Sequence, residues 1–173
     1  FTDGQQYEGD FRKGKMEGKG LYKYQKGDTY EGSFRNGKFN GNGTYTYSNG
    51  DKYIGDFKDY NKDGKGIYYY KNGDRYEGQY KNGAMEGKGI YHYKNGQKYD
   101  GEYKNNKKEG KGIMIYANKE KYEGEFKNGL RDGKGILYEV NGDRYEGEFK
   151  NDKKEGKGVV RTKKNEVYES TWK

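Results

Sequence analysis

The stretch Tyr76-Glu77-Gly78-Gln79-Tyr80, followed by Gly87-Lys88-Gly89-Ile90-Tyr91, decides the fold of this chain. Its opening pattern of aromatic, x, Gly, x, aromatic recurs every 23 residues without insertion or deletion. A fixed period of this length, held across a chain, indicates one supersecondary unit repeated side by side. A Gly-x-Gly follows each of the first seven copies. The copies begin at Tyr7, Tyr30, Tyr53, Tyr76, Tyr99, Tyr122, Tyr145 and Tyr168.

Both halves of the repeat alternate large and small or charged side chains with period two, which predicts strands and not helices. Asn72-Gly73-Asp74 is typical of the joining loops, because Gly takes the positive φ of a short hairpin turn. We therefore expect an all-β fold: an elongated single antiparallel sheet, a solenoid-like meander of 23-residue β-hairpin repeats. We expect residues 1–173 to form one array, with seven full repeats from Tyr7 and partial units at both ends.

Phe1 to Gln6 match the end of an earlier repeat, and there is no initiator Met. The chain is thus expected to be a fragment of a longer protein.

The side-chain sizes suggest a strand register in which Gly9 faces Tyr22 and Gly20 faces Phe34, so that each glycine lies opposite a ring. Glycine would then leave room for rings to lie across the sheet. Tyr60 stands where other repeats have a turn glycine, and tyrosine tolerates positive φ poorly. We expect the loop around Tyr60 to differ from its neighbours.

Hydrophobic residues are only 28% of the chain and the net charge is +8, values that favour disorder unless the 22 tyrosines supply the buried area. The absence of cysteine excludes disulfides and thiolate metal sites. No apolar run is long enough to span a membrane. His92 falls on the predicted charged face, which favours a surface histidine over a general base.

No motif indicates catalysis. The carboxylates recur at fixed offsets beside lysines, as on a solvated face, and Gly-x-Gly never extends to the phosphate-binding Gly-x-Gly-x-x-Gly. No Ser, Cys and His constellation is present. We expect no enzyme activity, no cofactor and no metal. Nucleic acid is not an expected partner either, because the rings are needed for the fold and lysines alternate with acids.

The sequence Tyr-Glu-Gly-Glu-Phe, with Lys-Asn and Gly-Lys-Gly after it, at residues 122–135 and 145–158, resembles the MORN (membrane occupation and recognition nexus) repeat. The resemblance implies a twisted β-hairpin sheet with a groove on one face. Members of that family are mainly scaffolds and tethers: ciliary radial-spoke proteins, cytoskeletal basket components, junctional membrane tethers, and modules attached to lipid kinases or a methyltransferase. It implies a cytoplasmic location, at a cilium or the cytoskeleton or peripherally on a membrane.

Our first hypothesis is a non-catalytic scaffold that docks partner proteins of a larger assembly, a helix or peptide lying in the aromatic groove. Tyrosine is an efficient interface anchor. The predicted docking residues are Tyr22, Tyr24, Tyr45, Tyr47, Tyr68, Tyr70, Tyr91 and Tyr93.

Two alternatives stay open. The first is a tether for phosphoinositides or other anionic phospholipids, to which each clustered lysine would contribute about 1 kcal/mol. The second is a regulatory array of an enzyme, such as a lipid kinase, whose catalytic domain lies outside these residues.

An apolar column is expected on the face away from most tyrosines, and two interpretations of it are equally good: β-propensity, or a stripe that docks a helix or a second copy. Its members are Leu21, Thr44, Ile67, Ile90, Ile113, Ile136 and Val159.

Overall fold

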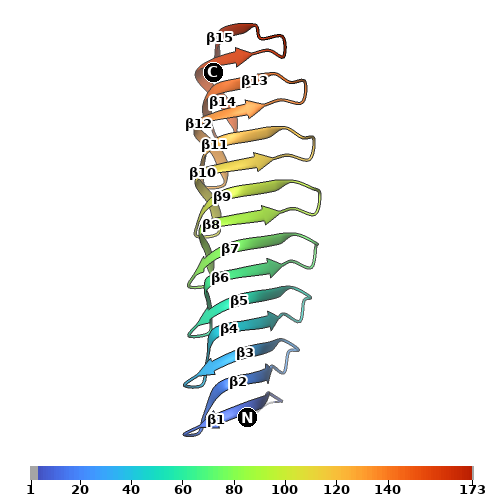
Figure 1. The fold of residues 1–173 in the computed structure, drawn as a ribbon, viewed down its shortest axis with the longest axis vertical. Coiled ribbons are helices and arrows are strands. Elements are labelled where there is room, and N and C mark those ends of the chain that lie inside the picture. Colours follow the sequence, from blue (N-terminus) through green and yellow to red (C-terminus); the bar gives the residue numbers. More distant parts are fainter. Residues whose placement is uncertain (1–3, 173) are drawn as a thin grey trace. The chain divides into compact units, whose positions relative to one another are not determined.

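The structure, a computed structural model, describes residues 4–172, and these form strands joined by short loops (Figure 1). Strand order in the antiparallel sheet follows chain order, so the all-β meander is confirmed. No described residue belongs to a helix that could cross a membrane. The strands are β1 (Gln6–Arg12), β2 (Lys15–Lys23), β3 (Thr29–Arg35), β4 (Lys38–Thr46), β5 (Lys52–Lys58), β6 (Asn61–Tyr69), β7 (Arg75–Lys81), β8 (Ala84–His92), β9 (Lys98–Lys104), β10 (Lys107–Ile115), β11 (Lys121–Lys127), β12 (Leu130–Tyr138), β13 (Arg144–Lys150), β14 (Lys153–Arg161) and β15 (Val167–Trp172).

The chain divides into two compact units, Phe1–Met85 and Glu86–Lys173. The same hairpin builds both. In each unit the register places tyrosine opposite tyrosine and glycine opposite glycine: Tyr30 faces Tyr22 and Tyr45, while Gly32 faces Gly20 and Gly43. The expected pairing of glycines with rings is therefore wrong by two residues.

The physical reason is the direction of the ring. Tyr30 does not extend across to a glycine directly opposite it; its ring lies back along the strands, over Gly32 and Gly43. A Cβ added at Gly43 would stand 2.5 Å from Cε2 of Tyr30. One ring thus needs a pair of facing glycines, which explains why two glycine positions recur for every buried tyrosine.

A β-bulge bends each hairpin toward the tyrosine face. Between Gly32 and Phe34 the pairing moves two residues along β3 but four along β4, from Gly43 to Phe39. Such a bulge turns the strand and strengthens its twist. The bend brings Phe39 onto Tyr30, with ring centroids 3.7 Å apart, and Phe57 of the next repeat packs edge-on at 5.0 Å.

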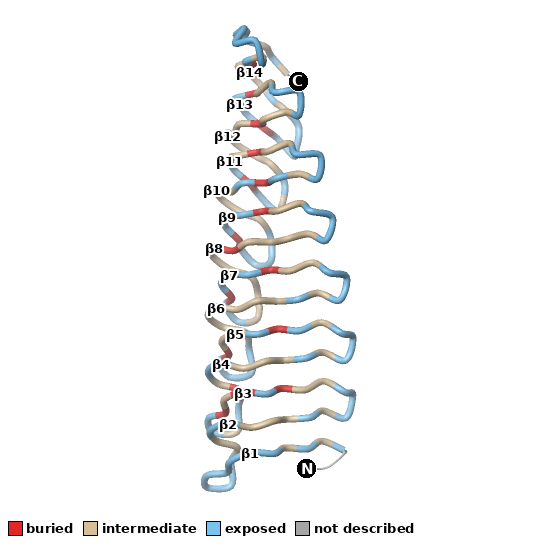
Figure 2. Tube along the Cα trace, turned by 45° about the vertical axis from the view of Figure 1, so that its right-hand side comes forward, coloured by how far each residue is buried: buried red, intermediate tan, exposed pale blue. Residues whose placement is uncertain are grey.

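The core therefore lies between the sheet and the bent hairpin tips. The first tyrosine of each central repeat is fully buried, and the buried segments fall within the strands (Figure 2). Each such ring removes about 150 to 250 Å² from water, which compensates for the shortage of aliphatic residues. The tyrosines with zero exposure are Tyr30, Tyr53, Tyr76, Tyr99, Tyr122 and Tyr145.

The loop at Tyr60 has the same geometry as its neighbours, so the expectation of a different loop is wrong. Asp59 and Tyr60 have φ of 47° and 71°, close to 52° and 82° at Asn36 and Gly37. Three contacts offset the strain of tyrosine at positive φ. Its hydroxyl donates to the carbonyl oxygen of Gly37 at 2.5 Å, its amide donates to the carbonyl oxygen of Phe39 at 3.2 Å, and its ring packs on Phe39.

Candidate functional site

Six tyrosines of the first unit form a continuous line of rings, here named the tyrosine strip. All are half-buried, so each presents part of its ring to solvent. Successive ring centroids are separated by 4.8, 6.0, 4.5, 5.7 and 4.5 Å. The members, in this order, are Tyr22, Tyr24, Tyr45, Tyr47, Tyr68 and Tyr70. In the second unit, Tyr91 and Tyr93 form an equivalent pair at 4.5 Å.

Aspartates in the loops hold the strip in place. The hydroxyl of Tyr45 donates to Asp28 at 2.8 Å, and that of Tyr68 donates to Asp51 at 2.9 Å. The other oxygen of Asp28 accepts the amide of Ser48 at 2.7 Å, which ties one loop to the next. Rings fixed in this way lose little further rotamer freedom when a partner binds.

The electrostatics keep the hydroxyls neutral donors. Burial, followed by the bond to Asp28, raises the pKa of Tyr45 well above its usual value, and burial raises the pKa of Tyr24 to about 12. The amide of Ser48 is the largest of the influences that lower the pKa of Asp28. The donor and acceptor therefore keep these roles throughout the neutral pH range.

A second set of side chains borders the strip, at what we name the cover position, two residues before each Gly-x-Gly. The ring of Phe39 stacks on that of Tyr30, and its centroid lies 6.3 Å from the ring centroids of both Tyr22 and Tyr45. At the next cover position, the Nζ of Lys62 lies 4.7 Å from the ring centroid of Tyr68. The cover residues are Met16, Phe39, Lys62, Met85, Lys108, Arg131 and Lys154.

The sequence reasoning missed the cover position. In the sequence its lysines resemble solvated surface charge, because a pattern of alternating residues does not reveal the bulge that turns them onto the aromatic face. The signal available was the appearance of Met and Phe at the same repeat position.

In the second unit, the repeats after Tyr116 have no tyrosine at the two repeat positions that form the strip in the first unit. Met114, Leu137 and Val160 occupy the repeat position of Tyr22 and Tyr45, and all three are buried. Glu139 replaces the outer tyrosine and pairs with Lys154 at 2.9 Å. These repeats therefore keep the core but present fewer rings to a partner.

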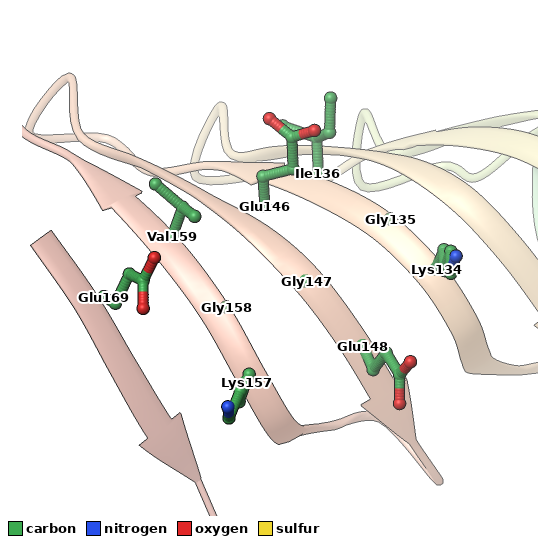
Figure 3. Close-up of a pocket in the computed structure, with 10 residues that line it drawn as sticks. All are labelled: Lys134, Gly135, Ile136, Glu146, Gly147, Glu148, Lys157, Gly158, Val159 and Glu169. Carbon is green, nitrogen blue, oxygen red and sulfur yellow. The ribbon is translucent and has the colours of Figure 1, made fainter. Parts of the chain in front are cut away.

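The opposite face of the sheet carries shallow depressions between side chains. One in the first unit has a volume of about 860 Å³ and is bordered by Leu21, Thr44 and Ile54. One in the second unit, of about 530 Å³, has Ile136 and Val159 between lysines and glutamates (Figure 3). The members of the predicted apolar column that border these depressions, Leu21, Thr44, Ile136 and Val159, thus lie on the face away from most of the tyrosines.

The carboxylates on this opposite face serve the backbone. Asp56 accepts the amide of Lys65 at 2.9 Å, and Glu125 accepts that of Lys134 at 3.2 Å, both next to the bulge. His92 lies on the same face, opposite Lys98 in the register of β8 and β9. Within residues 4–172, no group of three His, Asp or Glu side chains is arranged to hold a metal ion.

Comparison with solved structures finds the same fold in the TCP domains of SAS-4 and CPAP. The TCP domain of Drosophila melanogaster SAS-4 (dCPAP), in complex with a proline-rich motif of Ana2, superposes with a TM-score of 0.57 at 15% identity, covering 90% of this chain and 85% of that domain. The TCP10 domain of Danio rerio CPAP, in complex with a peptide of STIL, superposes with a TM-score of 0.59 at 15% identity, covering 96% of this chain and 74% of that one. At this identity the similarity shows the fold alone.

Comparison with curated proteins gave no significant match. The MORN repeat model, in contrast, matches seven consecutive segments: residues 7–29, 30–52, 53–75, 76–98, 99–121, 122–144 and 145–163. Each segment begins at the first tyrosine of a 23-residue repeat, and all of these tyrosines except Tyr7 are fully buried. The chain therefore belongs to the MORN repeat family.

Proposed function

We propose that this chain is a non-catalytic protein-binding module of a larger assembly, and that the tyrosine strip is its docking surface. The observation that carries the proposal is the unbroken line of half-buried rings from Tyr22 to Tyr70. These rings are in excess of what the core requires, because the fully buried tyrosines already cover the glycine pairs. Interface hot spots are enriched in tyrosine, because its ring is large and amphipathic and its side chain has few rotatable bonds.

The occupant proposed for the strip is an extended, proline-rich peptide. Aromatic surfaces bind polyproline II segments, whose preformed geometry lowers the entropy cost of binding. A polyproline II helix rises about 3.1 Å per residue, so every third residue recurs after about 9.3 Å. Equivalent rings of successive repeats are two strands apart, about 9.6 Å. One peptide turn therefore matches one repeat.

The setting we propose is cytoplasmic and cytoskeletal, at a centriole or cilium. The support comes from proteins with the same fold, whose TCP domains bind peptides of Ana2 and STIL, in one case through a proline-rich motif. A further fold relative, the CPAP G-box domain, is connected with centriole elongation.

The test is binding of a fluorescein-labelled peptide with the repeat Leu-Pro-Pro, followed by fluorescence anisotropy. The variant is Tyr45→Leu combined with Tyr68→Leu, because Leu137 occupies the same repeat position and shows that the fold accepts leucine there. Loss of two anchors worth about 1 kcal/mol each should weaken binding about 30-fold.

The matched control is Tyr69→Leu, a tyrosine 38% exposed on the opposite face. It should leave the affinity unchanged, and circular dichroism should show intact β-structure in all variants. Equal affinity of the strip variant and wild type would refute the assignment of the strip. Failure of the wild type to bind the peptide, with binding to phosphoinositide vesicles instead, would favour the membrane tether.

A further inference from the structure

The ammonium group of Lys62, like that of Lys108 in the second unit, lies among aromatic rings. The Nζ of Lys62 lies 4.7, 5.3 and 5.6 Å from the ring centroids of Tyr68, Tyr80 and Tyr53. Tyr53 and Tyr80 are buried, whereas Tyr68 belongs to the tyrosine strip. No ion pair among the described residues includes Lys62.

Two other cations at the cover position, Lys154 and Arg131, form ion pairs with carboxylates. Lys154 pairs with Glu139 at 2.9 Å, and Arg131 pairs with Asp152 at 3.3 Å. Ring faces attract a cation, but less than a carboxylate at the same distance does. Burial lowers the pKa of Lys62, and the more distant charge of Asp51, which raises it, offsets this only in part.

The fold does not require a cation at this place. Met16, Phe39 and Met85 occupy the cover position in other repeats, and Phe39 packs well on the core. A positive charge held beside the strip, where an apolar side chain would cover the core equally well, points to a role in recognition.

We infer that Lys62 receives the carboxylate of an acidic side chain on a peptide docked along the tyrosine strip, and so determines which peptide binds. The inference rests on the proposed function. Because one polyproline II turn spans one repeat, residues three apart on the peptide meet successive cover positions. Phe39 precedes Lys62, and Met85 follows it. The preferred peptide is therefore apolar-x-x-acidic-x-x-apolar, a pattern that reads the same in both directions.

The test compares fluorescein-labelled peptides containing Leu-Pro-Pro-Glu-Pro-Pro-Leu, its Gln variant and its Lys variant, by anisotropy at low ionic strength. Wild-type protein should bind the Glu peptide about tenfold more tightly than the Gln peptide, the ratio expected for a hydrogen bond to a charged group. The Lys peptide should bind most weakly. Added salt should reduce the preference for Glu.

Lys62→Met should remove the preference while retaining affinity for the Gln peptide, and Lys62→Glu should reverse it toward the Lys peptide. Both Met16 and Met85 indicate that methionine is tolerated at this position. The control is Lys65→Met: Lys65 is exposed on the opposite face of the sheet, so this variant should behave as wild type.

A Glu preference that persists in Lys62→Met, or equal binding of the Glu and Gln peptides to wild type, would overturn the role of Lys62 and leave the strip as the docking site. Absence of binding by all three peptides would overturn the proposed function, and the role of Lys62 with it. Loss of phosphoinositide-vesicle binding in Lys62→Met, without any peptide binding, would reassign the lysine to a lipid headgroup.

Discussion

The glycine pairs predict a specific defect for Gly43→Ala. The added methyl group would lie 2.5 to 2.6 Å from two ring carbons and the hydroxyl oxygen of Tyr30, about 1 Å closer than ordinary van der Waals contact. The ring has nowhere to move, because it is fully buried, stacks on Phe39 at 3.7 Å and donates its hydroxyl to the carbonyl oxygen of Ser33 at 2.9 Å.

The magnitude follows from two terms. Overpacking a filled core costs about 1 to 3 kcal/mol, and displacing the ring also weakens a buried hydrogen bond worth about 1 kcal/mol. We expect Gly43→Ala to lower the free energy of unfolding by about 3 kcal/mol, measured by urea denaturation with circular dichroism. Gly37→Ala is the control, because nothing lies within 4 Å of its added Cβ; its φ of 82° should cost only about 1 kcal/mol.

A double-mutant cycle decides whether the ring is the cause. Tyr30→Leu removes the clashing atoms, so Gly43→Ala should cost at least about 1 kcal/mol less in that background than in wild type. The account of the glycine pairs would be refuted if Gly43→Ala destabilised the protein less than Gly37→Ala does. It would also be refuted if the effects of Gly43→Ala and Tyr30→Leu were additive.

Two further predictions concern the loops. Asp28→Asn should reduce the dependence of stability on pH in the acid range. Because the pKa of Asp28 is lowered in the folded state, its carboxylate stabilises the fold above the unfolded pKa of about 3.9, and this stabilisation is lost as the pH falls through the folded pKa. The melting temperatures of wild type and variant should therefore converge at low pH. Tyr60→Ala should lower the free energy of unfolding by about 1 to 2 kcal/mol, because alanine keeps the strain at positive φ and loses the ring contact with Phe39. Tyr60→Gly should be less destabilising in the same melts, because glycine relieves the strain. A glycine variant less stable than the alanine variant would contradict the strain argument.

The repeat period was sufficient to predict the hairpins, the antiparallel meander and the face on which the tyrosines lie. It could not decide the register, because a shift of two residues leaves the same side chains on the same face. What decides it is the ring of Tyr30, which needs both Gly32 and Gly43 beneath it. The bulge after Gly32 is equally invisible to a pattern of alternating residues.

Among the candidate site residues, the sequence located the strip but not its border. Lys62 appeared to be one more surface lysine in a lysine-rich chain, since only the bent hairpin brings it to Tyr68 and Tyr80. The role of the strip in binding stays a prediction, and the peptide experiments above address it.

The way in which each buried tyrosine is covered has a consequence for how arrays of this kind can change in length. Tyr122 rests on Gly124 and Gly135 of its own repeat, and only its lateral cover, Phe149, comes from the next. Trp172 provides that cover for Tyr145, at 4.6 Å. Loss or duplication of a whole 23-residue segment would therefore leave every buried tyrosine with its glycine pair and with an aromatic residue of the next repeat packed against it. Loss of part of a segment would remove one of these contacts and expose a tyrosine ring. Genetic variation in such chains should proceed in whole repeats.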